Sequence, residues 1–385
     1  MGAMSDHFDL AALGRDAAAR SAEIESLRRL PDDLAQGIRS LGFGRAMAPV
    51  EVGGGEWTVA DTVERLEELA YWDGATAWCA MIAATTSLIS GSLTEAWCET
   101  IYGDPAAHTG GFAAPVGRAT RAGDGLEVTG RWQWGSGTHH CTWIGGGALI
   151  VDDDGNPSPL DDGTVAPFVL FPADDVTLDA DSWRVSGLRG TGSVDYRVDS
   201  AVVPRDRWVQ IGGVPTIDRP LYRFSFLGAL AVGISAIALG LARRAHDELV
   251  DMAGGKRPQG SSKTLAERSV VQDAIANADA ARRAAQLLLE DAIQGAWAVA
   301  EDGGGVDAPT RLALRQAATH ATKTAAGSVD VCYHAGGGAA VHDRSPLQRV
   351  FRDVHVATQH AMVAPRIMEV VGRSLLGLPT EVGQL

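Results

Sequence analysis

Residues 130–151, GRWQWGSGTHHCTWIGGGALIV, are the part of the chain best suited to contact a flat organic ligand. A Gly135–Ser136–Gly137 turn follows alternating residues that predict a strand. Flanking glycines let a backbone approach a planar ring closely, and the Ser136 hydroxyl can donate or accept a hydrogen bond at the ring edge. Trp134 is predicted to lie on the same strand face and to support the ring. The alternative is a hairpin turn with core tryptophans.

Two adjacent histidines, His139 and His140, follow this turn. On a strand their side chains would point to opposite faces, so one metal ion could not easily bind both. We predict no metal site and a structural role for His140. The cysteines form no CxxC pair, which predicts neither a zinc site nor a disulfide framework and favours a reducing, cytoplasmic location; they are Cys79, Cys98, Cys141 and Cys332. The opening residues, MGAMSDHFDL, lack the apolar run of a signal peptide.

A second candidate stretch, 334–360, reads HAGGGAAVHDRSPLQRVFRDVHVATQH. Pro346 predicts the start of a helix that carries His360. A histidine with a pKa near neutrality could take a proton from a substrate or offer a hydrogen bond. The alternative is a solvated histidine on a bundle face. Three glycines before this helix predict a helix end that a ligand can approach closely: Gly336, Gly337 and Gly338.

The stretch GLRGTGS, 187–193, is also glycine-rich, but it is not a GxGxxG motif and it leads into a strand. Phosphate binding at a helix N-terminus therefore does not apply to it. We predict a tight turn that sets the geometry of the sheet, with Arg189 as its only candidate ligand contact.

The surrounding elements predict three parts. Apolar residues at helical spacing predict an N-terminal helical domain over 1–108. Short β-branched segments separated by Gly, Asp and Pro predict a central antiparallel β-barrel or β-sandwich of about six to eight strands over 109–218. Long periodic segments predict a C-terminal four-helix bundle over 219–385. The predicted fold class is therefore α+β multidomain, with a ligand cleft between domains.

The net charge of −15 argues against a broad nucleic-acid surface and against binding to an anionic membrane. Residues 224–242, FSFLGALAVGISAIALGLA, carry no charge and are almost long enough to span a bilayer. They are rich in small residues, and a charged RRAHDE follows directly. We therefore predict a helix buried inside the protein rather than a membrane helix.

The order of these parts, together with four local stretches, resembles the acyl-CoA dehydrogenase fold. Within it the closest likeness is to flavin-dependent monooxygenases, the oxygenase components of two-component systems. The resemblance covers nearly the whole chain. The stretches are PVEVGGGEWTVADTVERLEELAYWDGATAW, GRWQWGSGTHHCTW, VSGLRGTGSVDYRVDSAVVP and AGGGAAVHDRSPLQRVFRDVHVATQH.

The resemblance implies a flavin, either FMN or FAD, whose reduced form a separate reductase supplies. Ser136 would lie beside N5 and O4 of the isoalloxazine. The glycine run at 336–338 would meet the flavin of a neighbouring subunit, which implies a homo-oligomer, expected to be a tetramer. Arg257, in GGKRPQGSS, would meet a flavin phosphate, with a solvated loop arginine as the alternative. The other predicted flavin contacts are Trp134, Gly135 and Gly137.

A true acyl-CoA dehydrogenase removes a proton with a glutamate, and neither usual position of that base holds a carboxylate here. One position is Ala361, and the other lies in LYRFSFLGALAV, 221–232. Without the base, dehydrogenation loses a proton transfer that contributes about 10²–10⁴-fold. Related oxygenases carry a histidine that faces the flavin C4a, and His360 corresponds to it. The resemblance therefore implies a monooxygenase that uses reduced flavin and O2 to hydroxylate or oxidise a small aromatic, polyketide-like or amine substrate.

One position departs from the ring hydroxylases. Their second histidine, eight residues after an AW pair, corresponds to Thr86. Thr86 and Phe224 are the predicted substrate contacts. Two alternatives stay open: a flavin dehydrogenase with a relocated base, and a non-catalytic flavin-binding or protein-binding member of the fold.

Overall fold

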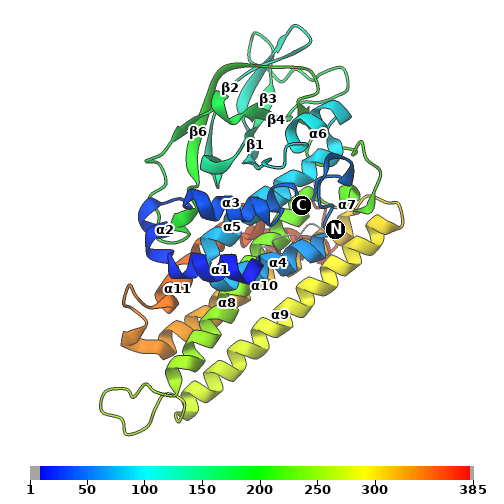
Figure 1. The fold of residues 1–385 in the computed structure, drawn as a ribbon. Coiled ribbons are helices and arrows are strands. Elements are labelled where there is room, and N and C mark those ends of the chain that lie inside the picture. Colours follow the sequence, from blue (N-terminus) through cyan, green and yellow to red (C-terminus); the bar gives the residue numbers. More distant parts are fainter. Residues whose placement is uncertain (1–8, 382–385) are drawn as a thin grey trace, which may run out of the picture.

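The computed structural model describes residues 9–381. Residues 1–8, which hold most of the segment without a signal-peptide pattern, and residues 382–385 lie outside the described part. Figure 1 shows three parts: short helices across the middle of the molecule, a β-sheet above them, and long helices that extend below. The predicted α+β class, with helices, strands and helices in that order, is confirmed.

The first part packs around α5 (Gly74–Ser87), in which every residue except Ile82 is buried. The Asp73 carboxylate caps α5 by accepting a hydrogen bond from the Thr76 backbone N–H at 2.8 Å. The preceding helix, α4 (Val59–Trp72), begins in a capping box. The other elements are α1 (Leu10–Ala19), α2 (Ser21–Leu27), α3 (Asp32–Ser40), η1 (Phe43–Arg45), η2 (Val50–Val52), η3 (Leu88–Ser92) and α6 (Glu95–Tyr102).

Seven strands form one sheet in the order β5–β6–β2–β1–β3–β4–β7. Neighbouring strands are antiparallel except β1 and β3, because β3 runs opposite to β2 and pairs with the other side of β1. The prediction of a purely antiparallel β-barrel or β-sandwich is therefore wrong in detail: the seven strands form one sheet with β5 and β7 at its two ends, and it contains one parallel pair. The strands are β1 (Thr109–Ala122), β2 (Gly125–Gly135), β3 (Trp143–Ile150), β4 (Phe168–Pro172), β5 (Thr177–Asp179), β6 (Val194–Val203) and β7 (Trp208–Val209).

Two tryptophans of β2 have opposite environments. Trp132 is fully buried, stacks on Tyr196 with ring centroids 5.4 Å apart, and donates to the Gly147 carbonyl at 2.8 Å. Trp134 is 58% exposed and has a φ of 61°. This left-handed backbone breaks the alternation of the strand. Trp134 and Ser136 therefore do not share a strand face, and the expectation that they do is wrong.

The third part contains three long helices, α8 (Phe226–Ala253), α9 (Ser269–Glu301) and α10 (Ala308–Gly336). Among residues 9–381, α8 is the one helix long and apolar enough to cross a membrane, but 78% of its apolar window is buried inside the protein. The prediction of a buried helix is confirmed. The shorter elements are α7 (Pro220–Arg223), η7 (Gly337–Ala339), α11 (Pro346–Ala357), η8 (Ala361–Val363) and α12 (Arg366–Leu375).

The predicted fourth helix is broken. The sequence predicts that His360 lies on the helix that begins at Pro346. In the structure this helix, α11, ends at Ala357, and His360 is the N-cap of η8. The His360 imidazole takes a hydrogen bond from the Met362 backbone N–H at 3.2 Å. This local side-chain bond competes with continuation of the helix.

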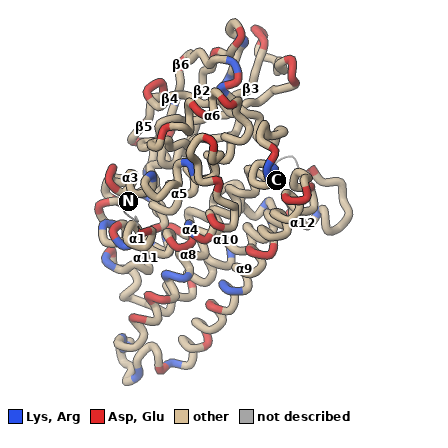
Figure 2. Tube along the Cα trace, turned by 45° about the vertical axis from the view of Figure 1, so that its right-hand side comes forward, with Lys and Arg blue, Asp and Glu red and all other residues tan. Residues whose placement is uncertain are grey.

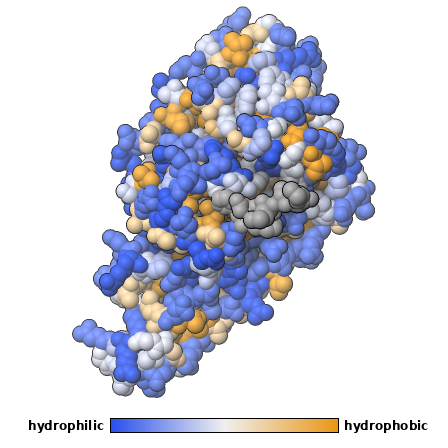
Figure 3. Space-filling view, viewed as in Figure 1, coloured by the Kyte–Doolittle hydropathy of each residue, from blue (hydrophilic) through white to orange (hydrophobic). Residues whose placement is uncertain are grey.

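The excess of acidic residues is spread over the molecule rather than gathered in one region. Figure 2 shows acidic and basic residues interspersed along helices and loops, while the inner strands hold few charges. The face in Figure 3 is mainly hydrophilic, with separate apolar patches. In the view of Figure 2, Lys and Arg do not gather into a broad basic region of the kind that binds nucleic acid.

Candidate active site

Ser136 lies in the turn that follows β2, and it is only 6% exposed. Its Oγ accepts a hydrogen bond from the Trp78 indole N–H at 3.1 Å. It also lies 2.6 Å from the hydroxyl oxygen of Ser193. The Ser136 hydroxyl is therefore held by α5 on one side and by the 187–193 turn on the other.

His360 lies against the same indole, with the two ring centroids 5.8 Å apart. Its Nδ1 accepts the Met362 backbone N–H. Burial lowers the pKa of His360 to about 4, and the positive charge of Arg315 acts in the same direction. Arg315 is itself buried, and its Nε donates to the Met362 carbonyl at 3.2 Å. The imidazole is thus neutral in the ordinary pH range.

Trp78 therefore joins the two predicted catalytic side chains, Ser136 and His360, although sequence analysis gave it no role in the site. Its partners lie 58 residues away in the β-domain and in η8 near the end of the chain. The signal in the sequence was its position in an otherwise apolar helix, "GATAWCAMIAATTS", where an indole N–H needs a partner.

An apolar wall borders this group. The exposed Trp134 ring meets Phe112 edge-on, with centroids 5.7 Å apart. Ile82, the one half-buried residue of α5, lies close to Gly110, where a Cβ would come within 3.3 Å of the Ile82 Cγ2. Exposed aromatic surface, a buried hydroxyl and an imidazole N–H suit a flavin ring, which is flat and apolar with polar atoms along its edges.

The 187–193 turn does more than shape the sheet. Thr191 and Ser193 hydroxyl oxygens lie 2.6 Å apart, and the Thr191 carbonyl accepts the Gly137 backbone N–H at 2.8 Å. The Leu188 backbone N–H donates to the Asp353 carboxylate at 2.5 Å, which ties the turn to α11. The sequence gives no local signal for the contacts of Thr191, Ser193 and Asp353, because these side chains meet their partners only through tertiary packing. Within residues 9–381, Arg189 makes no hydrogen bond with Ser136, Trp78 or His360.

Asp353 is a buried carboxylate at the junction of α11 and the turn. Burial raises its pKa to about 7, while the Leu188 N–H opposes the rise. The neighbouring Asp73 carboxylate raises it further, and two arginines of α11, Arg349 and Arg352, lower it.

Arg257 and the glycine run form a second group. Arg257 is exposed in the α8–α9 loop, and the ammonium of its neighbour Lys256 donates to the Gly336 carbonyl. Arg315, beside His360, and Gly336 are 21 residues apart in α10, which corresponds to about 32 Å along the helix. Within one chain the structure therefore does not bring Arg257, or the glycines at 336–338, to Ser136.

The two predicted substrate residues also lie apart. Thr86 is buried, and its carbonyl accepts the Tyr102 hydroxyl at 3.3 Å. Phe224 lines a cavity of about 600 Å³ that does not include Thr86, Ser136 or His360. This cavity lies between η3, the segment after β7, the start of α8 and the α9–α10 loop; its lining includes Leu88, Ile89, Phe226, Val306 and Arg311.

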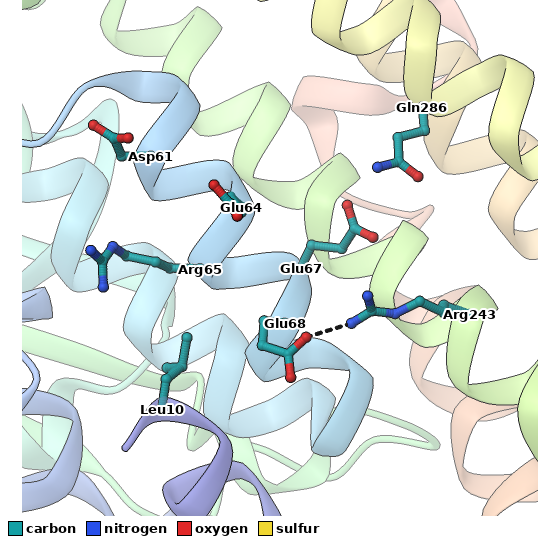
Figure 4. Close-up of a pocket in the computed structure, with 8 residues that line it drawn as sticks. All are labelled: Leu10, Asp61, Glu64, Arg65, Glu67, Glu68, Arg243 and Gln286. Atoms are coloured by element: carbon teal, nitrogen blue, oxygen red, sulfur yellow. Dashed lines mark hydrogen bonds and ion pairs between the residues drawn. The ribbon is translucent and has the colours of Figure 1, made fainter. Parts of the chain in front are cut away.

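A separate pocket of about 520 Å³ lies between α4, α8 and α9 (Figure 4). Glu68 forms an ion pair with Arg243 at 2.8 Å, and burial raises the pKa of Glu67. Since carboxylates dominate its wall, this pocket does not suit flavin phosphates. Its lining is Leu10, Asp61, Glu64, Arg65, Glu67, Glu68, Arg243 and Gln286.

The two histidines after the turn lie in a 3-10 turn, η4 (Thr138–His140), and not on a strand as expected. His140 is buried, and one of its ring nitrogens lies 3.1 Å from the Leu30 carbonyl. Burial lowers its pKa to about 4. These contacts fit the predicted structural role. Within residues 9–381 no group of three or more His, Cys, Asp or Glu side chains is placed to hold a metal ion.

Comparison with known proteins supports the predicted resemblance. Residues 232–365 match the family model "Acyl-CoA dehydrogenase, C-terminal domain". The chain is 29% identical to indole-3-acetate monooxygenase of Pseudomonas putida, over 93% of this chain and 90% of that one. It is also 29% identical to the flavin-dependent monooxygenase oxygenase subunit HsaA of Rhodococcus jostii, over 94% and 95%. The structure of XiaF from Streptomyces sp., in complex with FADH2 and glycerol, matches with a TM-score of 0.89 and 26% identity, over 98% and 97%.

Fold and relatives together define the class: a flavin-dependent oxidoreductase with the acyl-CoA dehydrogenase architecture. Within that class the protein is similar to oxygenase components of flavin-dependent monooxygenases, and the predicted resemblance is confirmed. Being similar to an oxygenase subunit implies a separate reductase partner.

Proposed function

We propose that the protein uses Ser136 and His360 as the polar guides of a flavin monooxygenase that hydroxylates a small aromatic substrate. The observation that carries this proposal is the indole of Trp78, which contacts both side chains beside the exposed Trp134 wall. The charge acting on His360 is the Arg315 guanidinium, not a carboxylate that would serve as a dehydrogenase base. A bound reduced flavin would supply the electrons that activate O2.

The geometry favours one of the two expected roles for His360. Because Nδ1 accepts the Met362 N–H, the neutral imidazole carries its proton on Nε2. With a pKa near 4 the ring stays neutral at physiological pH. The Nε2 proton of His360 is therefore available for a hydrogen bond to a ligand, and proton removal from the substrate is the less suited role.

The substrate and the form of flavin belong to this proposal as well. The names of the relatives point to aromatic substrates. Thr86, on the same buried helix as Trp78, is proposed to contact the substrate. The flavin is FMN or FAD, and the FADH2 bound to XiaF supports FAD.

We further propose a homotetramer in which neighbouring copies share each flavin. The α8–α9 loop, which holds Arg257, lies at the lower end of the molecule in Figure 1, below the β-sheet, and Lys256 of this loop donates to the Gly336 carbonyl. In this proposal a second copy brings Arg257 and the 336–338 glycines to the flavin. Helix α9 has apolar surface for such a contact, since Leu287 is 64% exposed and Val270 62% exposed.

Four free cysteines within the described residues agree with a cytoplasmic location.

The proposal is tested by mixing the anaerobic complex of the protein and reduced flavin with O2. A monooxygenase is expected to form an absorbing species, distinct from reduced and oxidised flavin, that persists for seconds and decays faster when an aromatic substrate is present. Incorporation of ¹⁸O from ¹⁸O2 into the product confirms the transfer. Direct conversion of reduced to oxidised flavin with stoichiometric free peroxide, with and without substrates, contradicts the proposal.

A further inference from the structure

We propose that the substrate is an aromatic acid and that Arg311 binds its carboxylate in the cavity of about 600 Å³ between η3 and the start of α8. This inference deepens the proposed function and rests on it, because it names the class of substrate that the flavin site oxidises. It gives Arg311 a role in binding and specificity, and none in the flavin chemistry.

Two arginines line this cavity, and the protein itself engages only one of them. The Arg223 Nε donates to the Asp218 carboxylate at 2.6 Å, and a terminal nitrogen of the same guanidinium donates to the Ala300 carbonyl at 2.9 Å. Among residues 9–381, by contrast, no hydrogen bond or ion pair holds the guanidinium of Arg311, and its Nε is shielded from solvent without a partner. Arg311 therefore brings a positive charge and unused donors to the wall of the cavity.

The acidic side chains near this charge already have partners. Asp218 is paired with Arg223. Asp307 caps α10 and accepts the Thr310 backbone N–H at 2.9 Å. Hydrogen bonds from Thr310 lower the pKa of Asp307, and the charge of Arg311 acts in the same direction without forming an ion pair. A ligand carboxylate, which can accept two parallel N–H bonds from a guanidinium, supplies the missing partner.

The rest of the lining suits an aromatic ring. Tyr222 and Phe224 are 7% and 4% exposed, and the Tyr222 hydroxyl is used elsewhere, because it donates to the Met47 carbonyl at 3.2 Å. A small inorganic anion would leave this wall without contacts, and the volume lies in the ordinary range for sites that hold small organic molecules. The aromatic and aliphatic side chains of the wall include Leu88, Ile89, Tyr222, Phe224, Phe226 and Val306.

The cavity adjoins the helix that carries the candidate active site. Leu88, in its wall, directly follows α5, and Thr86 lies two residues earlier near the end of that helix. Trp78, whose indole contacts both polar guides, is ten positions before Leu88, which corresponds to about 15 Å along a helix. In the proposed arrangement the carboxylate stays at Arg311 and the aromatic ring extends toward Thr86.

The experiment compares an acid with its uncharged amide. Indole-3-acetate and indole-3-acetamide are titrated calorimetrically into the full-length protein, with and without reduced flavin under anaerobic conditions. The acid should bind about 10–100-fold more tightly than the amide, the effect of a charged hydrogen-bonded pair. Arg311→Gln should remove this preference and leave amide binding unchanged, whereas Arg311→Lys should retain part of it. Lys323→Gln, which removes an exposed cation from the same helix, is the matched control and should bind like wild type.

A second variant tests the location of the site. Val306 is 9% exposed and lines the cavity, so the larger side chain of Val306→Phe extends into the space proposed for the ligand. Its affinity for the acid should fall at least about tenfold. Full affinity for the acid in a folded Val306→Phe variant places the ligand elsewhere and overturns the inference.

The outcomes separate this inference from the proposed function. If wild-type protein binds acid and amide equally, or if Arg311→Gln weakens both alike, the inference fails even where oxygen transfer is observed. If acid binding depends on Arg311 but no oxygen-dependent flavin species forms, the proposed function fails and Arg311 remains an acid-binding residue. If Arg311→Gln does not fold, the wild-type preference for the acid and its loss in Val306→Phe decide the question.

Discussion

The indole ring of Trp78 lies 5.8 Å from the imidazole of His360, centroid to centroid, while its N–H donates to Ser136. One side chain of a buried helix thus sets the distance between a turn of the β-domain and a turn near the end of the bundle. The relative position of the two polar groups is therefore fixed by a helix that is buried over almost its whole length.

Substitution of His360 separates its two chemical roles. His360→Ala is expected to slow oxygen transfer by about 10²-fold, because a preorganised hydrogen-bond donor is lost. His360→Gln keeps an N–H near the position of Nε2 and should recover product formation to within roughly tenfold of wild type. Product is measured with reduced flavin and an aromatic compound that the wild-type protein converts. Flavin affinity is measured in parallel. A glutamine variant no better than alanine shows that His360 acts as a base.

Trp78→Phe keeps an aromatic ring but removes the N–H that reaches Ser136. The loss of this hydrogen bond and of part of a buried ring should lower the free energy of unfolding by roughly 1–3 kcal/mol. Urea unfolding measures this difference, and an unchanged free energy of unfolding contradicts the stabilising role of the Trp78–Ser136 hydrogen bond.

The sequence predicts this site unevenly. Ser136 and His360 are predicted, the first from a glycine-flanked turn and the second from the resemblance to related oxygenases. Trp78, Thr191 and Ser193 are not, because their hydroxyl and indole partners depend on packing: Ser136 lies 58 residues from Trp78 and 57 from Ser193. Periodicity shows which face of a helix is apolar, but it does not show which polar group a buried N–H will meet.

The fold, like the site, could be predicted only in part from the sequence. Helical and strand periods predict the order of the three parts, since each depends on a few consecutive residues. They fail where a single residue overrides the pattern. The left-handed φ of Trp134 turns the end of β2, and the His360 imidazole takes the Met362 N–H and ends the expected helix. Both exceptions lie at the candidate site, where local rules are most often broken.

Asp353→Asn is expected to stabilise the protein at high pH and not at low pH. The folded-state pKa of Asp353, about 7, lies above its unfolded value, so its favourable contribution is present at low pH and is lost as the pH rises through 7. Asparagine keeps an acceptor for the Leu188 N–H and carries no charge beside Asp73.

The free energy of unfolding of this variant, measured with urea, should exceed that of wild type by roughly 1–4 kcal/mol more at pH 8 than at pH 4.5. Asp251→Asn, at an exposed position of α8, is the matched control and should show no such trend. An equal difference at both pH values for Asp353→Asn means that the carboxylate is charged throughout.

Mixing two inactive variants tests whether copies share a site. Ser136→Ala removes the hydroxyl proposed to contact the flavin ring. Arg257→Ala removes the guanidinium proposed to contact a flavin phosphate, and Arg257 lies in the loop at the other end of the bundle. In a pair made of one copy of each, one composite site receives both defects and the other receives none. Co-expression at equal amounts should therefore restore about a quarter of the wild-type flavin sites, counted by bound flavin and by product. Separately purified variants mixed without subunit exchange provide the control. Absence of any recovery in a demonstrated mixed oligomer shows that each flavin is held by one chain.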